Sequence, residues 1–443
     1  MTAFVRSWLV MASVALLCNG SWAQAPQYAG PNPQFEGFAP GWGVPYNSGH
    51  APPSNQPMPD YELLPANRTP WWDVDNVIDL GVKDFVANSW IRAEYLHANF
   101  QKPGSNLLGA PVSTVANPRE PFLITAGDVL DAQAIVPDTS RLDLNAQNGV
   151  RTTIGLNAFK DFSIVGSYVG MLDMKSSFRL TPGGVANPAA NPLLFNPTLF
   201  PNNNRFFATS VLNDGAVGSR LILYDRSFEA AIRAKYWSGD VNMLFNYHVP
   251  STGFRLQPLL GFRYNSYDED LVQHGEFDNS SGVSANLGTL TTPTRNTILS
   301  TAQNTMYMGQ VGFQAELVDK WFTLGFAPKV ALGANSVRAR VITSDLRDST
   351  ITELANDGVT SSRKTGVVFG TNIDLNTYLK IRVNPWLSLT GSAFYWYMPN
   401  VARAHNTIVY DDKGILLPPA FHPQIKTHGL GVNGFTVGAE ITF

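Results

Sequence analysis

The 443-residue sequence contains one cysteine, few charged residues and no long apolar run. The cysteine, Cys18, lies in an N-terminal segment that we expect to be removed, so disulfides and thiol chemistry do not apply to the mature chain. Charged residues make up 15% and the formal net charge is −3, which gives no electrostatic basis for binding nucleic acid. No segment approaches the run of about 18 apolar residues typical of a membrane-spanning helix, which excludes a helical inner-membrane protein.

The first 23 residues have the organisation of a secretory signal peptide. Arg6 supplies a positive charge, an apolar run follows from Trp8 to Leu17, and Ser21-Trp22-Ala23 has the small residues of a cleavage site. We therefore predict that residues 1–23 are a signal peptide, cleaved after Ala23. The alternative is a segment retained as a membrane anchor.

Residues 24–88 are rich in proline, glycine and asparagine. Such a segment cannot bury enough apolar surface to offset the entropy that it would lose on ordering. We predict that it is a mostly disordered periplasmic leader and that residues 89–443 form the folded domain. The aromatic residues scattered through the leader leave open a role as contacts for a partner.

The last fourteen residues alternate strictly between apolar and polar or small positions. One face carries Phe435, Val437, Ala439, Ile441 and Phe443, and the other carries Gly434, Thr436, Gly438, Glu440 and Thr442. A period of two predicts a β-strand with one apolar face. In a transmembrane β-barrel that face contacts lipid, and an aromatic residue at the strand end lies at the membrane interface.

The same alternation recurs in ten segments of the chain. They span residues 90–100, 141–158, 162–172, 228–236, 254–268, 307–317, 322–333, 372–381, 387–397 and 430–443. The pattern predicts an all-β protein, a transmembrane antiparallel up-and-down β-barrel of about ten strands. Twelve strands are the alternative, with the extra pair at 121–136 or at 241–248.

The connections between these segments alternate in length. Short turns fall at 160–161, 319–320 and 383–385, with an intermediate one near 238–253; long polar loops fall at 101–140, 173–220, 269–303, 341–364 and 399–428. This alternation is expected of a barrel with both chain ends in the periplasm.

Aromatic residues gather at the predicted strand ends, as in interfacial girdles. At the periplasmic end they include Tyr236, Trp237, Trp321, Trp386 and Phe443, and at the other end Tyr264, Tyr267, Tyr395 and Tyr397.

Two stretches carry a family resemblance, Trp90-Ile91-Arg92-Ala93-Glu94-Tyr95 and Leu259-Leu260-Gly261-Phe262-Arg263-Tyr264. The first resembles the opening strand, and the second the middle hairpin, of the planctomycete outer-membrane β-barrel porins. The strand before Ser227 departs from the family's pattern. The resemblance covers residues 90–443 and implies passive transport, but it carries no established functional residues.

The polar faces of the predicted strands supply charged candidates for the barrel lumen. They are Arg92, Glu94, Arg151, Glu229, Arg233, Lys235, Arg263, Glu316, Lys329, Asp374 and Glu440. If a pore exists, we predict that its constriction lies near Arg151, Glu229, Arg233, Arg263, Glu316 and Asp374. The alternative is a lumen filled by mutually paired charges, because barrels of about eight strands are filled and open channels come with about sixteen or more.

Sequence motifs for catalysis or metal binding are absent. No GxSxG, phosphate loop, HExxH or cysteine nucleophile occurs, so we predict no catalytic residue, cofactor or metal. Asp268-Glu269-Asp270 carries clustered carboxylates of the kind that bind Ca²⁺, but no ligand loop follows, and a solvated charge run is the favoured interpretation. His422 and His428 share a predicted loop without metal spacing.

Three functions are consistent with these observations. The leading one is a passive outer-membrane channel for small hydrophilic solutes. The second is a structural or adhesive surface barrel with a closed lumen that acts through its long loops, and the third is an outer-membrane enzyme with a site assembled from separate strands. The expected partners are outer-membrane lipid, the barrel-assembly machinery through Phe443 and a second copy of the chain, and no nucleic acid is expected.

Overall fold

The computed structural model describes residues 88–443, with gaps at 113–114, 121, 125–131, 158–160, 182–204, 213–218, 246, 249–252, 280–289, 347–357 and 412–420. The predicted signal peptide, residues 1–23, and the predicted leader, residues 24–88 apart from Asn88, lie outside the described residues. None of the helices in the described part of the chain is both long enough and apolar enough to cross a membrane.

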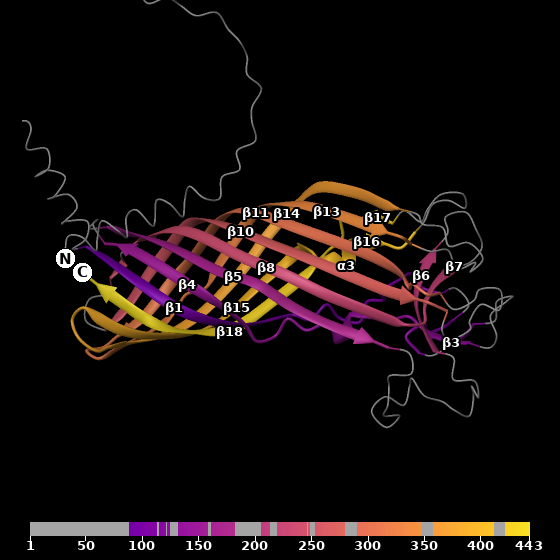
Figure 1. The fold of residues 1–443 in the computed structure, drawn as a ribbon. Coiled ribbons are helices and arrows are strands. Elements are labelled where there is room, and N and C mark those ends of the chain that lie inside the picture. The colour runs from indigo at the N-terminus through magenta and orange to yellow at the C-terminus, as the bar shows by residue number, and fades with distance from the viewer. Residues whose placement is uncertain are drawn as a thin grey trace, which may run out of the picture. The chain divides into compact units, whose positions relative to one another are not determined.

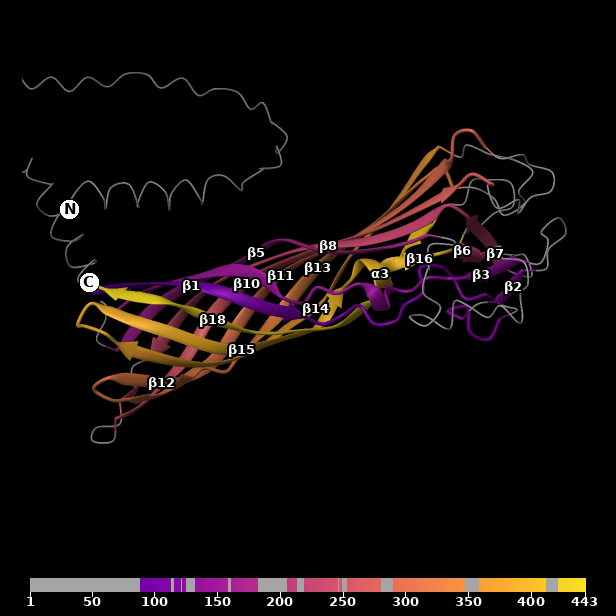
Figure 2. The ribbon, with the colours of Figure 1, turned by 60° about the horizontal axis from the view of Figure 1, so that its bottom comes forward.

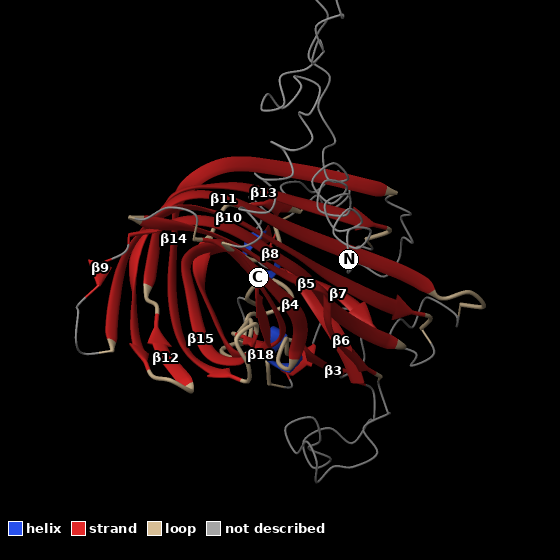
Figure 3. Cartoon of the chain, turned by 90° about the vertical axis from the view of Figure 1, so that its left-hand side faces the viewer, coloured by secondary structure: helices blue, strands red, loops and turns tan. Residues whose placement is uncertain are grey.

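A closed ring of ten antiparallel strand positions forms the wall of the molecule (Figures 1 and 3). The strands, in ring order, are β1 (Ser89–Phe100), β4 (Gln147–Leu156), β5 (Phe162–Leu180), β8 (Ser227–Phe245), β10 (Phe254–Phe277), β11 (Thr294–Val318), β12 (Phe322–Phe326) with β13 (Lys329–Ser344), β14 (Val359–Arg382), β15 (Leu387–Ala402) and β18 (Thr427–Thr442). Both β12 and β13 pair with β11 and β14, so together they fill one position. The prediction of an all-β barrel of about ten strands is confirmed.

The last strand closes the ring against the first. β18 pairs with β1 in a continuous register from Trp90 opposite Thr442 to Phe100 opposite Val432. On its other side β18 pairs with β15. The closure satisfies the backbone groups of both strands, which a membrane-embedded sheet edge would leave without partners.

The remaining elements are not strands of the wall. β2 (Phe122–Ile124), β3 (Ala132–Ile135), β6 (Arg205–Leu212) and β7 (Ser219–Tyr224) form a separate sheet, in which β3 and β6 are parallel. The turn η1 (Thr139–Arg141), the short helix α3 (Ala404–Thr407), and the pair β16 (Ile408–Val409) and β17 (His422–Pro423) complete the fold.

The alternative of twelve wall strands is wrong for both of its proposed extra pairs. The segment 121–136 contributes β2 and β3 to the separate sheet rather than to the ring. Residues 241–245 continue β8, and β9 (Tyr247–His248) extends the same position, because it pairs with β10 beyond the end of β8.

Several wall strands are much longer than predicted. β10 has 24 residues, β11 has 25 and β14 has 24, so residues 269–277 and 294–303 of the predicted loop 269–303, and residues 341–344 and 359–364 of the predicted loop 341–364, are strand. A strand of about 9–11 residues suffices to cross a bilayer. These strands therefore project well beyond the membrane on the side away from the C-terminus (Figure 1).

Because the strands extend beyond the membrane, their outward side chains change from apolar to charged along the strand. In β8 the outward side chains Val241, Met243 and Phe245 are exposed and apolar, whereas Arg233 and Lys235, on the same face, are exposed and charged. The inward face changes in the opposite sense, from Asp240 to residues such as Phe228 and Ile232. Outward side chains are apolar where a strand contacts lipid and polar where it contacts water. β8 does both, because one part of it lies in the membrane and the other part lies in water.

We call the outward apolar surface the apolar band. It includes Val150, Ile154, Val241, Leu260, Phe262, Val311, Phe313, Leu332, Val367, Phe369, Leu379, Leu389, Phe435 and Val437, all of them exposed. We call the part of the barrel within this band the terminal half, because the C-terminus lies at its end, and the part beyond it the loop half.

Aromatic clusters mark the edges of the apolar band. Trp237 and Tyr264 have ring centroids 4.5 Å apart, and Tyr264 and Tyr307 5.1 Å apart, on three neighbouring strands at the boundary with the loop half. Trp321, Trp386 and Phe443 are exposed at the opposite end. The predicted placement of Tyr236 and Trp237 at the periplasmic end is wrong, because β8 continues to Phe245 before it turns. Tyr267, predicted in the girdle, points into the lumen and is buried.

Candidate functional site

The lumen of the terminal half contains a cavity of about 530 Å³, which we call the chamber. Every second residue of a barrel strand faces inward, so the chamber collects polar side chains from around the ring. Five basic and three acidic side chains line it: Arg92, Arg151, Arg255, Lys329, Lys380, Asp240, Glu316 and Glu440. The chamber is therefore polar with a small excess of positive charge.

Four of the six predicted constriction residues lie in the lumen. Arg151 and Glu316 line the chamber, and Arg263 and Asp374 pair with each other inside the barrel. Their role at a constriction stays a prediction.

The other two, Glu229 and Arg233, are on the outer face of β8, so the prediction that they face the lumen is wrong. Lys235 lies on the same outer face. The error has a physical cause, since this part of β8 projects into water and its apolar side chains face inward.

The guanidinium group of Arg263, on β10, contacts carboxylates on two other strands of the wall. Its Nη2 lies 2.6 Å from Asp374 Oδ2 on β14 and 3.3 Å from Asp240 Oδ2 on β8. β10 and β14 are separated by two strand positions, so the group crosses part of the lumen. All three side chains are buried, and an arginine fork can hold two carboxylates at once. Sequence reasoning missed Asp240 because it assigned residues 238–253 to a turn.

Most charges near the chamber are paired in the same way. Arg92 Nε donates to Glu440 Oε2 at 3.0 Å, and Lys380 donates to the other oxygen of Glu440. Tyr378 donates its phenol to Glu316 Oε1 at 2.6 Å. Pairing of this kind fixes the side chains around the chamber and limits its width.

A layer of aromatic side chains crosses the lumen beyond the chamber. Phe100 on β1 has its ring centroid 6.3 Å from those of both Tyr236 on β8 and Tyr267 on β10. Tyr236 lies 5.6 Å from Trp396 on β15, which stacks on Phe394 at 4.3 Å. β8 and β15 are on opposite sides of the ring, and all five rings are at most 5% exposed. The aromatic layer therefore spans the lumen.

Beyond the aromatic layer, the connection from β15 to β18 folds into the loop half. We call its described residues, 403–411 and 421–426, the plug (Figure 2). Side chains of the wall bond its backbone: Ser300 Oγ donates to the Ala404 carbonyl at 2.8 Å. Just before the plug, Asn304 Nδ2 donates to the Ala402 carbonyl at 2.7 Å. Ile408, Tyr410 and Phe421 are buried in the apolar core of the loop half.

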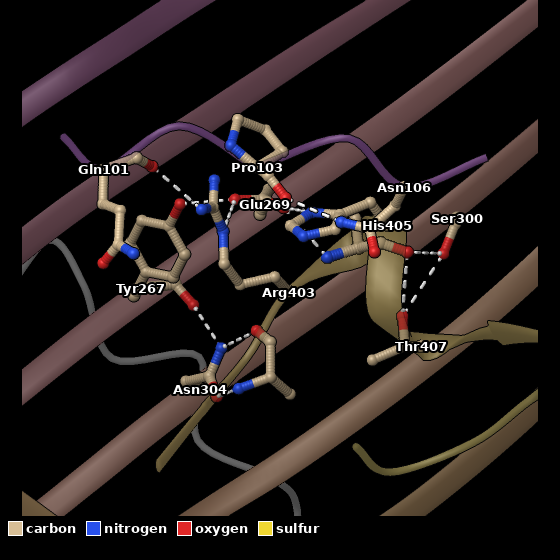
Figure 4. Close-up of polar contacts among 12 residues, drawn as sticks. Gln101, Pro103, Asn106, Tyr267, Glu269, Ser300, Asn304, Arg403, His405 and Thr407 are labelled. Carbon is tan, nitrogen blue, oxygen red and sulfur yellow. Dashed lines mark hydrogen bonds and ion pairs between the residues drawn. The ribbon is translucent and has the colours of Figure 1, made fainter. Parts of the chain in front are cut away.

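Glu269 is the charged centre of the plug contact (Figure 4). Its carboxylate accepts a hydrogen bond from Arg403 Nε at 2.9 Å, from Ala404 N at 3.0 Å and from the Tyr267 phenol at 2.5 Å, and His405 Nδ1 lies 3.4 Å away. Together with Arg403 Nη1, which donates to the Gln101 carbonyl at 2.9 Å, these bonds fix the plug between β10 and the end of β1.

The protonation states at this contact follow from burial and from the neighbouring charges. Asp268 and Asp270 face outward on either side of Glu269, so this level lies outside the apolar band. Although burial opposes it, the Arg403 guanidinium lowers the pKa of Glu269 to about 2. Burial lowers the pKa of His405, which is therefore neutral at neutral pH.

The structure divides the predicted acidic run between the two faces of β10. Glu269 points into the barrel, whereas Asp268 and Asp270 lie opposite Lys235 and Arg233 on the outer face of β8. The interpretation of the whole run as solvated charge is therefore wrong for Glu269, because a strand sends neighbouring residues to opposite faces.

These features define the class of the protein as an outer-membrane β-barrel with a partly filled lumen. The family described as "Putative beta barrel porin-7 (BBP7)" matches residues 90–443, and the chain belongs to this family.

Known structures include similar barrels, at low identity and TM-scores below 0.5. The outer-membrane protease OmpT of Escherichia coli is 12% identical with a TM-score of 0.39, over 81% of this chain and 97% of that one. The translocator domain of the autotransporter NalP of Neisseria meningitidis is 10% identical with a TM-score of 0.23, over 84% and 96%. A Pseudomonas aeruginosa FadL homologue is 9% identical with a TM-score of 0.22, over 80% and 90%. The comparison with curated proteins finds no match.

Proposed function

We propose that this protein lets small hydrophilic solutes cross the outer membrane and that the conformation described above is its closed form. The chamber supports this proposal, because a sealed barrel has no need of a polar cavity of about 530 Å³ lined by charged side chains. Solutes enter the chamber from the terminal side, and passage requires the aromatic layer and the plug to move. Membership of a family described as porins agrees with this function.

The plug is suited to such movement because it is not part of the wall. No wall strand pairs with β16 or β17, which pair only with each other among the described strands. Its polar contacts with the wall include bonds to wall side chains: Ser300 Oγ donates to the Ala404 carbonyl, and Glu269 accepts from Ala404 N. Releasing it therefore leaves the ring of strands intact.

A reversible disulfide between wall and plug tests this proposal. Ser300 Oγ contacts the Ala404 carbonyl, and the folded domain has no cysteine, so the variant S300C/A404C introduces the only pair. In planar bilayers we expect single-channel steps from the wild type and from the reduced variant, and none from the oxidised variant. The single variant S300C controls for loss of the hydroxyl. Equal conductance of the oxidised and reduced variants would show that the plug is not the gate.

A sealed barrel that acts through its loops is the second candidate, and the aromatic layer favours it. Five buried rings pack against one another across the lumen. This candidate predicts no conductance from the wild type or from any plug variant, and no swelling of proteoliposomes in isotonic sugar. Swelling with small sugars would exclude it.

A further inference from the structure

Three arginines form an exposed cluster on the outer wall of the loop half. Arg338 and Arg340 lie on β13 and Arg363 lies on the neighbouring strand β14, all with outward and exposed side chains. Arg340 is directly opposite Arg363, and Arg338 is directly opposite Thr365. Cross-strand neighbours on one face of an antiparallel pair have their Cβ atoms about 5 Å apart, so like charges repel there.

The described part of the chain supplies no carboxylate to these arginines. Among the described residues, none forms an ion pair with Arg338, Arg340 or Arg363. Arg340 Nε donates a hydrogen bond to the uncharged hydroxyl of Ser361 at 3.1 Å.

The opposite arrangement is seen on β8 and β10. There, the outward cations Arg233 and Lys235 lie directly opposite Asp270 and Asp268. Among the described residues, the β13–β14 surface therefore has an uncompensated positive charge at a register position where the same barrel elsewhere pairs its charges.

Apolar side chains lie next to the arginines, on the side of the apolar band. Val367 is 72% exposed and Phe369 is 61% exposed on the outer face of β14, within the apolar band. The Val367 position is next to that of Thr365 and Arg338 on the same face, at a spacing of about 7 Å along the strand. A ligand that contacts both the arginines and these apolar side chains needs an anionic head group and an apolar body.

We propose that this surface binds a phosphorylated membrane lipid. Arg338, Arg340 and Arg363 hold its phosphate groups, because guanidinium groups bind phosphate in a bidentate manner, and its acyl chains lie against Val367 and Phe369. The bound phosphates offset the repulsion between Arg340 and Arg363. Lipid of the leaflet nearest the loop half occupies the site, and the site is independent of conduction through the lumen.

Native mass spectrometry of the full chain, folded in a zwitterionic detergent, tests this proposal. Lipid A with two phosphates is the probe, and the dephosphorylated lipid and inorganic phosphate are the comparison ligands. We expect the variant R338Q/R340Q/R363Q to bind lipid A about tenfold more weakly than the wild type, since three charge-assisted contacts are lost. The matched control R233Q/K235Q removes outward cations that face carboxylates, and its affinity stays within about twofold of the wild type.

The comparison ligands identify the source of the phosphate. A lipid site binds lipid A, is not emptied by inorganic phosphate at the same concentration, and loses affinity in V367S/F369S. Displacement by inorganic phosphate would mean a phosphate site without lipid recognition, and this would overturn the proposal. Equal affinities of the wild type and the triple-arginine variant would also overturn it. The shift in gel mobility on boiling verifies that each variant is folded, and R340Q alone serves if the triple variant does not fold.

Discussion

Glu269 on β10 and Arg403 in the plug form a buried ion pair between residues 134 positions apart in the sequence. Arg403 Nε lies 2.9 Å from Glu269 Oε2, and their side chains are 3% and 0% exposed. Breaking a buried pair by removing one partner leaves an uncompensated charge and costs roughly 3–5 kcal/mol. The pair therefore decides how firmly the plug is held.

Replacing Glu269 by glutamine should loosen the plug. The variant E269Q leaves the Arg403 guanidinium buried without a counter-charge, so the docked plug loses roughly 3–5 kcal/mol relative to the released one. We expect more frequent channel openings in planar bilayers and faster cleavage of the plug by an added protease.

The adjacent Asp268 provides a matched control. D268N changes the same chemical group one residue away, but Asp268 faces outward and lies opposite Lys235, where a pair is worth at most about 1 kcal/mol. The frequency of channel openings and the rate at which the protease cleaves the plug should be the same in D268N as in the wild type. If D268N behaved like E269Q, the effect would be one of total charge and not of the plug contact.

Acid should weaken the plug contact in two steps. Burial lowers the pKa of His405, so its contribution is complete above the unfolded value of about 6.5 and is lost as the pH falls below it. The pKa of Glu269, lowered to about 2, gives a contribution that is complete above the unfolded value of about 4.3 and is lost as the pH falls towards about 2.

Protease accessibility of the plug, followed from pH 7 downward, measures this dependence. We expect cleavage to become faster first below about pH 6.5 and again below about pH 4. E269Q should lack the second increase because it has no carboxyl group at this position. A wild type and an E269Q variant with identical profiles below pH 4 would contradict the assignment to Glu269.

Much of the wall could be predicted from the sequence, because lipid imposes a strict rule on every second residue. The ten strand positions and the β1–β18 closure follow from that alternation. The rule fails where a strand leaves the membrane. In β8 the large apolar residues occupy even positions from Phe228 to Tyr236 and, apart from Leu244, odd positions from Trp237 onward, and this change of parity marks the boundary of the apolar band.

The plug and its contacts could not be predicted in the same way. Arg403 and His405 lie in a segment without alternation, and Glu269 reads as one residue of an acidic run. Only the fold brings them together, because the pairing of β10 with its neighbours turns Glu269 inward. A buried charge partner far away in the sequence has no local signal.

Arg263 should be more important for stability than for solute passage. The variant R263M removes the cation that pairs directly with the buried carboxylates of Asp240 and Asp374, which costs roughly 3–5 kcal/mol and lowers the temperature at which the folded gel band disappears. Adding D240N and D374N to R263M neutralises both carboxylates and should recover most of the lost stability. A triple variant no more stable than R263M would show that the charges are not the cause.

Phe443 should affect assembly of the barrel more than the properties of the assembled molecule. Its backbone N–H donates to the Ser89 carbonyl at 3.2 Å, and its ring is 57% exposed at the edge of the apolar band. It does not line the chamber, whereas Glu440 and Thr442 of the same strand do. Deleting it removes one bond at the β1–β18 closure and the terminal aromatic ring, and leaves the lumen unchanged.

We therefore expect the Phe443 deletion to reduce the amount of folded barrel in the outer membrane, while the molecules that do assemble keep the single-channel conductance of the wild type. F443Y retains a terminal aromatic ring and should assemble normally if that ring is what the barrel-assembly machinery recognises. The fraction of protein with altered gel mobility before boiling measures assembly. Normal assembly of the deletion would exclude this role for Phe443, and reduced assembly of both variants would mean that the phenyl ring itself is required.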